Sequence, residues 1–323
     1  MVLKRKVHRQ FIAKRSLQLK IMYKIRCMAS LFLNKGGTNM QRIFLLWLML
    51  LPITVKQRSH IWAWAQARQA YRCNLAWMED CGFSDTQQQK LKHWYTQTSW
   101  STLLGHLQNV PTLTILDDAY PFCLKMIAQP PLVLFYAGDL SLLKRKTVAI
   151  VGSRQIQANT LAVLKTWVPE LVRQGYTVIS GNAAGVDSVV HRLVLGQRGQ
   201  TIAVIGTGLD YCYPKTNSAL QKYISEVGLV LSEYLPWFGP KQWHFPERNR
   251  IIVGLTQDVF ICQAAQKSGT MVTAEIALDE NRNLWVLPGN VLDPAYAGSF
   301  DLIREGAQIL IDVTDFTQGN DNM

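Results

Sequence analysis

From residue 147 onward, short runs of apolar residues alternate with longer stretches in which apolar residues recur at helical spacing. The runs are apolar at nearly every position, which is typical of strands buried on both faces of a parallel sheet. The predicted strands are 148–151, 177–179, 201–205, 229–232, 259–262, 284–287 and 308–311, and the predicted helices are 161–172, 186–196, 216–226 and 299–305, with a further helix opening at 268–270.

Strands that alternate with helices predict an α/β fold. Because crossovers between parallel strands are right-handed, we expect an extended Rossmann-like, doubly wound, mostly parallel sheet. This domain is predicted to span residues 147–313 and to be followed by a tail at 314–323. The pattern does not give the order of the strands within the sheet.

The chain before this domain follows a different pattern. Residues 40–107 are rich in Trp, Leu, Gln and Ala at helical spacing, which predicts a small helical N-terminal domain. Residues 108–146 carry the prolines and aspartates of turns around one apolar run at 132–136. We therefore expect a connector with a single lead-in strand.

Residues 43–51 are apolar and follow a basic residue at position 42, with alanines at 63, 65 and 67, which resembles a secretory signal peptide. Charged residues between 56 and 60 interrupt the approach to those alanines, and two tryptophans stand among them. The run is also shorter than the about 20 residues that cross a membrane. We favour a packed helix of the N-terminal domain and expect no membrane attachment.

The net charge of +12 invites a nucleic-acid partner, but its distribution weakens that argument. Residues 1–39 hold ten Lys or Arg and no acidic residue, so residues 40–323 keep a net charge of only +2. Any DNA site in the folded body must therefore be a local cluster. Residues 1–39 are interpreted either as a basic arm or as sequence upstream of a true start at Met40.

The six cysteines are scattered and form no CxxC pair or zinc-like spacing with histidine. Reduced, mostly buried thiols are the expected state, which favours a reducing compartment. We expect a cytoplasmic protein.

Candidate binding chemistry follows the predicted strands. Ligands of open α/β sheets bind beyond the carboxyl ends of the strands, where glycines and helix N-termini present N–H groups to anions. Here those ends carry Gly152-Ser153-Arg154, Ser180-Gly181, Gly206-Thr207-Gly208 and Lys267-Ser268-Gly269-Thr270. We expect these loops to converge and hold several phosphates. For any single loop, a tight turn without a ligand is the alternative.

Basic and aromatic residues accompany these loops. The candidate cations are Arg154, Lys215, Arg248 and Arg250 at a predicted helix start, and Lys267. The residues that can stack on bases are Tyr211, Tyr213, Trp243 and Phe245, with packing in the core as the alternative for each.

Familiar catalytic patterns are missing from the sequence. The first strand is not followed by GxGxxG, and no GxxxxGK[ST] occurs. Asp187 and His191 lie four residues apart, but without further ligands they are interpreted as a cap and a structural histidine rather than a metal site. Ser232, Glu233 and His244 form no recognisable nucleophile–base set. We predict no catalytic residue, no metal and no cofactor.

Many ordered motifs together resemble the DNA-processing protein A (DprA/Smf) family over residues 112–312. They are VAIVGSR at 148–154, SGNAAGVD at 180–187 with His191, TIAVIGTGLD at 201–210 with Tyr213-Pro214, SEY at 232–234, FPERNRII at 245–252, SGTMVTA at 268–274 and Pro288-Gly289. The resemblance implies single-stranded DNA binding, homodimerisation, and loading of the recombinase RecA onto incoming DNA during natural transformation, without turnover.

Carried over to this chain, the resemblance gives phosphate contacts to Gly152, Ser153 and Arg154, and extends the site to Lys215, Arg248, Asn249, Arg250 and the turn Ser268, Gly269, Thr270. Gly181 and Lys267 join the site from their places after strands. Ala184 stands where the family usually has Arg, and Gln263 where Glu is common. The winged-helix unit that ends many members is expected to be absent.

An enzyme on a related Rossmann scaffold that processes nucleotides is the alternative, because Ser268-Gly269-Thr270 with Glu275 loosely resembles the GGxGTxxE loop of such enzymes. A scaffold without a ligand is a third possibility.

Overall fold

The computed structural model describes residues 40–98, 103, 107, 110–313 and 316. The chain divides into two compact units, Met1–Val110 and Pro111–Met323. The basic segment 1–39 and most of the tail 314–323 lie outside the described residues. No helix among the described residues is both long and apolar enough to cross a membrane.

The first unit contains helices only among its described residues: α2 (Met40–Leu50), α3 (Val55–Arg68), the 3₁₀ turn η1 (Ala76–Met78) and α4 (Asp85–Gln97). Capping boxes start α3 at Thr54 and α4 at Ser84 and satisfy N–H groups that each first turn leaves open. The apolar run at 43–51 is buried, and Trp47 packs edge-on against Trp77 and Tyr95. This segment is therefore a core helix, as the interrupted signal pattern favoured.

The second unit is built on one sheet of β1 (Thr112–Thr114), β2 (Val133–Gly138), β3 (Thr147–Val151), β4 (Thr177–Ser180), β5 (Thr201–Ile205), β6 (Leu229–Ser232), β7 (Asp258–Ile261), β8 (Asn283–Val286) and β9 (Gln308–Ile309). The order is β1-β2-β6-β5-β4-β3-β7-β8-β9. β3 to β9 pair in parallel, whereas β1 and β2 are antiparallel additions at one edge. The predicted doubly wound, mostly parallel sheet is confirmed. The segment interpreted as a connector supplies two strands of this sheet.

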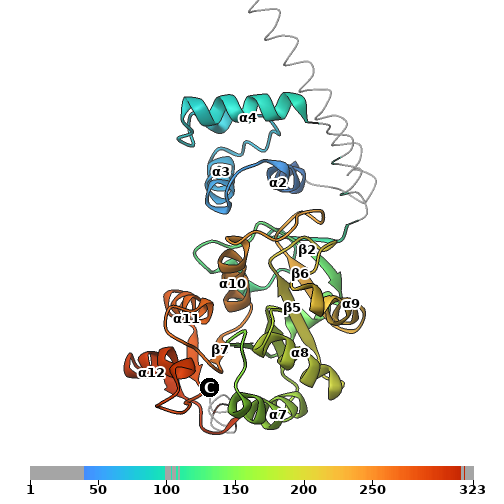
Figure 1. The fold of residues 1–323 in the computed structure, drawn as a ribbon. Coiled ribbons are helices and arrows are strands. Elements are labelled where there is room, and N and C mark those ends of the chain that lie inside the picture. Colours follow the sequence, from blue (N-terminus) through green and yellow to red (C-terminus); the bar gives the residue numbers. More distant parts are fainter. Residues whose placement is uncertain (1–39, 99–102, 104–106, 108–109, 314–315, 317–323) are drawn as a thin grey trace, which may run out of the picture. The chain divides into compact units, whose positions relative to one another are not determined.

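The order of the strands reverses at β3. The chain first passes from β3 through β4 and β5 to β6, with α7 (Ala158–Arg173), α8 (Val186–Gly196) and α9 (Ser218–Val227) as crossovers. It then returns through α10 (His244–Gly254) to β7 on the other side of β3, and continues through α11 (Gly269–Asp279) to β8 and through α12 (Ala297–Arg304) to β9. The two sets of helices lie on opposite sides of the sheet (Figure 1). The switch point lies between β3 and β7, where such folds bind ligands.

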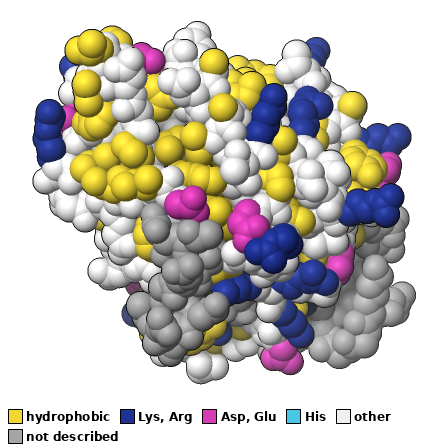
Figure 2. Space-filling view, turned by 90° about the horizontal axis from the view of Figure 1, so that it is seen from below, with side chains coloured by type: hydrophobic (Ala, Val, Ile, Leu, Met, Phe, Trp, Pro, Cys, Tyr) yellow, Lys and Arg dark blue, Asp and Glu magenta, His cyan; other side chains and the backbone are white. Residues whose placement is uncertain are grey.

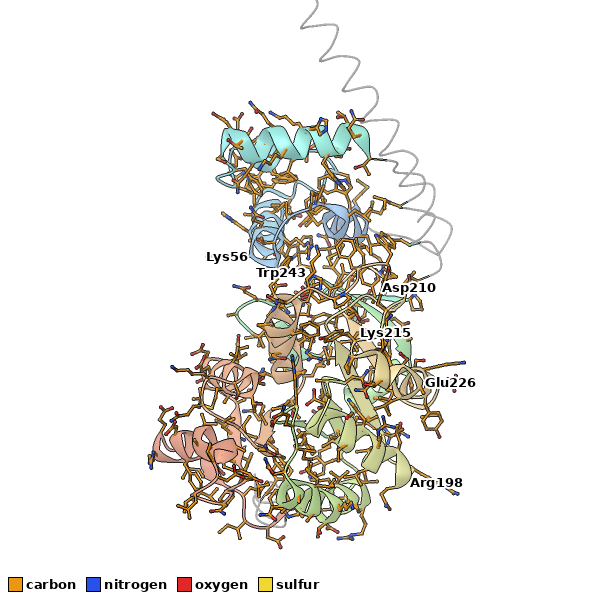
Figure 3. The ribbon with its side chains drawn as sticks, in the orientation of Figure 1. Lys56, Arg198, Asp210, Lys215, Glu226 and Trp243 are labelled. Atoms are coloured by element: carbon orange, nitrogen blue, oxygen red, sulfur yellow. The ribbon has the colours of Figure 1, made fainter. Side chains whose placement is uncertain are left out.

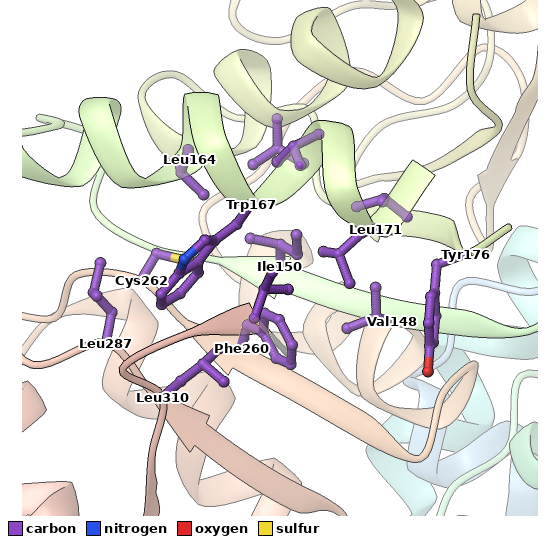
Figure 4. Close-up of a cluster of buried hydrophobic side chains, with 14 of the residues drawn as sticks. Val148, Ile150, Leu164, Trp167, Leu171, Tyr176, Phe260, Cys262, Leu287 and Leu310 are labelled. Atoms are coloured by element: carbon purple, nitrogen blue, oxygen red, sulfur yellow. The ribbon is translucent and has the colours of Figure 1, made fainter. Parts of the chain in front are cut away.

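Short elements complete the unit: α6 (Phe122–Lys125) and the 3₁₀ turns η2 (Leu140–Lys144), η3 (Lys215–Asn217) and η4 (Pro294–Tyr296). The main core lies between the sheet and α7, where Leu164, Trp167 and Leu171 pack on Val148 and Ile150 of β3 (Figure 4). A core of this kind fixes β3 relative to α7 and so fixes the loop that leaves β3 at the switch point.

Candidate nucleic-acid interface

A cavity of about 620 Å³ lies at the switch point, between the loop after β3, α10 and the start of α11. We call it the first cavity. It brings together eight of the twelve predicted site residues: Gly152, Ser153, Arg154, Arg248, Asn249, Ser268, Gly269 and Thr270. The other four, Gly181, Lys215, Arg250 and Lys267, are not part of its lining.

The loop after β3 is held rigidly and directs Arg154 outward. Ser153 Oγ accepts a hydrogen bond from Gln155 N–H at 3.1 Å, and Gln263 Nε2 donates to Gln155 O at 2.9 Å. Gln263 Oε1 also accepts from Gln157 N–H at 2.9 Å. The amide of Gln263 thus supplies both the donor and the acceptor that the loop needs, and a glutamate lacks that donor. The Arg154 side chain is exposed.

Gly185 lets this loop approach α8 closely. Its φ is +75°, and a Cβ there would overlap the carbonyl oxygen of Ser153. Only glycine accepts both conditions without strain. The glycine at position 185 of the SGNAAGVD motif is therefore required by the backbone that shapes the first cavity.

The N-terminus of α11 forms the opposite wall of the cavity. Ser268 caps the helix, its Oγ accepting from Met271 N–H. The first N–H groups of a helix lack partners within it and carry partial positive charge, so this turn favours anions. Lys267 precedes the cap with an exposed side chain.

The arginines of α10 are buried. The structure begins α10 at His244, so the prediction that Arg248 and Arg250 stand at a helix start is wrong. Pro246 fits the first turn because the N–H groups there need no helical partner. Both arginines consequently lie further along the helix, on its buried side.

Arg248 is 4% exposed, and its Nη1 donates to the carbonyl oxygens of Gly181 and Val204, at the ends of β4 and β5. Gly181 makes room for this guanidinium, since a Cβ there would lie 2.5 Å from Nη1. Gly181 therefore serves Arg248 in the structure and is itself buried. Arg248 forms part of the cavity floor.

Arg250 makes a buried ion pair with Glu233, with Nη2 2.6 Å from Oε2 and side chains only 10% and 3% exposed. This pairing neutralises the arginine and keeps it away from the lining of the first cavity. The positive charge of Arg250, which the sequence analysis assigned to DNA binding, is instead paired with Glu233 inside the protein.

Two titratable groups lie against Arg248. Burial raises the pKa of Asp187 above its ordinary value, while the guanidinium of Arg248 opposes that rise. Burial and the same positive charge lower the pKa of His191 to about 3. His191 Nδ1 lies 2.7 Å from Thr201 Oγ1, which itself donates to Val178 O, so the ring donates from Nδ1 and is neutral. This geometry agrees with the structural interpretation of His191.

Aromatic rings border the cavity on the α10 side. Tyr213 and Phe245 both line it, with ring centroids 5.3 Å apart, and the guanidinium of Arg154 lies 5.8 Å from the Phe245 ring. Trp243 and Tyr211 are exposed but are not part of this lining.

Lys215 is exposed on η3, two residues beyond Tyr213, and Figure 3 shows it with Asp210 on the segment between β5 and α9. Lys241 and Gln242 were not among the predicted site residues. The Nζ atom of Lys241 lies 5.2 Å from the Trp243 ring centroid, and Gln242 lines the cavity. A lysine two residues before a tryptophan, immediately before α10, was the available signal. On the face shown in Figure 2, Lys and Arg side chains lie in separate groups, so positive charge there is local.

Two alternatives to an anion site can be examined in the described part of the chain, a metal site and a nucleotide-processing site. No group of three or more His, Cys, Asp or Glu side chains there is arranged to hold a metal ion. Glu275, the residue that motivated the nucleotide-processing alternative, is exposed on α11 and does not line the first cavity.

Known proteins resemble this chain in sequence and in fold. The chain is 43% identical over 216 residues to DNA processing protein DprA of Streptococcus pneumoniae, covering 67% of this chain and 76% of that protein. The solved structure of DNA processing protein A from that species covers 87% of this chain and 98% of its own, with a TM-score of 0.77 and 35% identity.

A structure concerned with the single-stranded DNA binding mode of DNA processing protein A from Helicobacter pylori covers 66% of this chain and 96% of its own, with a TM-score of 0.60 and 31% identity. The family described as DNA recombination-mediator protein A matches residues 111–320, which include the whole sheet and the first cavity. The chain therefore belongs to the DNA recombination-mediator protein A (DprA/Smf) family and has a DNA-processing role.

Proposed function

We propose that this chain binds single-stranded DNA in the first cavity, protects incoming DNA, and loads RecA onto it during natural transformation or recombination. In this proposal it is a cytoplasmic binding protein that catalyses no reaction and needs no cofactor. The observation that carries the proposal is the convergence of the Arg154 loop and the α11 N-terminus on one cavity at the switch point.

The cavity walls suit phosphodiesters. Arg154 offers an exposed cation, and the α11 turn offers N–H groups with partial positive charge. Lys215 and Lys267 are exposed on neighbouring segments and can neutralise flanking phosphates. Such contacts recognise the backbone and carry no sequence information.

The aromatic border favours a single strand. Tyr213 and Phe245 offer ring faces on which unpaired bases can stack, each contact contributing about 1–3 kcal/mol. In a duplex the bases are already stacked on one another, so they gain nothing from these rings. We therefore expect single strands to bind more tightly than duplexes.

A homodimer is part of the proposal. β9 is an edge strand of the described sheet, and exposed apolar residues follow β8 and β9 in the chain, among them Leu292 at 86% and Ile311 at 76%. Unpaired strand edges with apolar neighbours favour pairing with a second copy. The recombination-mediator description of the family supports a recombinase as receiving partner, and RecA is the one we propose.

Oligonucleotide binding across a salt series tests the proposal. Three exposed cations, Arg154, Lys215 and Lys267, predict a slope of log affinity against log salt of about −2, at about −0.7 per phosphate for single strands. Fluorescence anisotropy of matched single and double strands measures both the slope and the preference. Absence of binding at low salt, or equal affinity for the duplex, would contradict the proposal.

A further inference from the structure

A second cavity, of about 360 Å³, lies beside α9 and shares no lining residue with the first. It is bounded by the loop Leu209–Cys212, by one side of α9, and by β2 and β6. The function proposed above makes no use of it. Its volume nevertheless exceeds that of one water, about 30 Å³, by roughly tenfold.

The floor and the border of this second cavity differ in chemistry. Ala137 and Val230, which pair directly across β2 and β6, form an apolar floor. Asp210 and Lys222 line the cavity with exposed side chains of opposite charge. An apolar surface bordered by one cation and one carboxylate matches a nucleobase with its attached phosphate, because the base has flat apolar faces and polar edges.

The loop beside the second cavity is fixed in place. The carbonyl oxygen of Tyr211 accepts hydrogen bonds from Thr207 Oγ1 and Gln221 Nε2, both at 3.0 Å. Gln221 Oε1 in turn accepts from Asn182 Nδ2 at 3.2 Å, and Asn182 precedes Ala183 of the first cavity. A cavity built on such a loop is preorganised, so a ligand does not have to order it.

Consecutive residues of the chain line the two cavities. Tyr211 and Cys212 line the second cavity, and Tyr213 lines the first. Two residues span at most about 7 Å, which is about two steps of a stacked strand at 3.4 Å per nucleotide. Neighbouring nucleotides of one strand can therefore reach Tyr213 and Tyr211 together.

We propose that the second cavity is a further nucleotide subsite, which receives the part of the same DNA strand that leaves the first cavity past Tyr213. This inference rests on the function proposed above. Tyr211 provides the ring beside the base, and Lys222 contacts the phosphate.

Asp210 gives the subsite a base preference. Its carboxylate repels phosphate and accepts hydrogen bonds, so the exocyclic amino group of cytosine suits it, as in other carboxylate–cytosine contacts. Thymine instead presents carbonyl oxygens at the corresponding edge. Because Asp210 is exposed, we expect a modest preference for cytosine over thymine, about fivefold, at the low end for such contacts.

Ligand length separates the two subsites. A single nucleotide, dCMP, is too short to occupy both cavities and is expected in the first, where the exposed cation and the α11 N-terminus lie, whereas an oligo-dC of about twelve nucleotides extends into the second. Tyr211→Ala and Lys222→Gln should each weaken the binding of the longer ligand about fivefold and leave that of dCMP unchanged. Tyr223→Ala is the matched control, since Tyr223 is 50% exposed against 46% for Tyr211 and lines neither cavity. If these two substitutions weaken the short and the long ligand equally, or weaken neither, the second subsite is wrong.

The base preference is measured with the longer oligonucleotides. Asp210→Ala should bring the dC to dT affinity ratio to about one, and Glu226→Ala, which changes an exposed acid on α9 outside both cavities, should leave the ratio intact. An unchanged ratio in Asp210→Ala overturns the role of Asp210. If the wild-type protein binds neither the short nor the long ligand, the function proposed above is wrong. If Arg154→Ala weakens the binding of both ligands while Tyr211→Ala weakens the binding of neither, only the second subsite is wrong.

Discussion

The loop after β3 and helix α10 both bring arginine to the same cavity, and they use it in opposite ways. Arg154 is exposed on a loop held by Gln263 and faces solvent. Arg248 and Arg250 are buried, one bonded to the carbonyl ends of β4 and β5 and the other paired with Glu233. Under the proposed function, Arg154 binds the ligand, whereas the structure uses Arg248 and Arg250 to hold the protein around the site together. Arg154 is exposed and has no carboxylate partner among the ion pairs of the described residues, whereas Arg248 and Arg250 are buried and hydrogen-bonded within the protein.

The largest effect should come from breaking the buried pair. Arg250→Met leaves Glu233 charged and unpartnered inside the protein, and we expect a loss of about 3–5 kcal/mol in the free energy of unfolding. Urea denaturation measures this loss. The double variant Arg250→Met with Glu233→Leu should recover most of it, because no buried charge then remains.

Arg250→Met should keep its DNA affinity under conditions in which it is folded. If the variant instead were stable and lost DNA binding, Arg250 would belong with Arg154 among the ligand contacts. The loop after β3 and helix α10 would then use their arginines in the same way.

Acid should act through His191, which lies against the charge of Arg248. Its pKa is about 3 in the folded protein against an ordinary 6.5, so below pH 6.5 the unfolded chain binds a proton that the folded chain refuses. Stability is therefore lost as pH falls from 6.5 towards 3, by about 1.4 kcal/mol per pH unit from this group.

His191→Gln keeps a donor for Thr201 without a titrating ring. Comparing urea denaturation of this variant and the wild-type protein at several pH values isolates the contribution of His191. Parallel pH profiles of the two proteins would argue against a buried neutral ring.

The smallest effect on folding, and a clear effect on binding, should come from Arg154→Ala. We expect single-stranded DNA affinity to fall about tenfold at low salt and the salt slope to become shallower by about 0.7. Stability should change by no more than about 0.5 kcal/mol, as for other exposed positions. Arg192→Ala, an exposed arginine of α8 outside both cavities, is the control. An unchanged slope in Arg154→Ala would remove Arg154 from the phosphate contacts.

The sequence predicted the sheet well because strands buried on both faces are apolar at nearly every position. It could not predict the order of the strands, since apolar runs such as β3 and β7 carry nothing that selects a neighbour. The convergence of Arg154 and Ser268 was predictable, because parallel strands end at one edge of a sheet.

The use of each cation in the site could not be predicted. Glu233 lies 17 residues from Arg250, and the carbonyl oxygen of Gly181 lies 67 residues from Arg248. A sequence gives the charge at a position but not the partner that compensates it. Without those partners, Arg248 and Arg250 looked equivalent to Arg154.

Gln155 and Gln263, which together hold the Arg154 loop, are 108 residues apart in the chain. A polypeptide still emerging from the ribosome carries the glycine loop long before its opposite wall has been made. The growing chain accordingly has no assembled first cavity until Ser268–Thr273 have been made, and under the proposed function it gains the capacity to bind DNA only then. Proteolytic fragments that end before α11 should inherit the same incapacity.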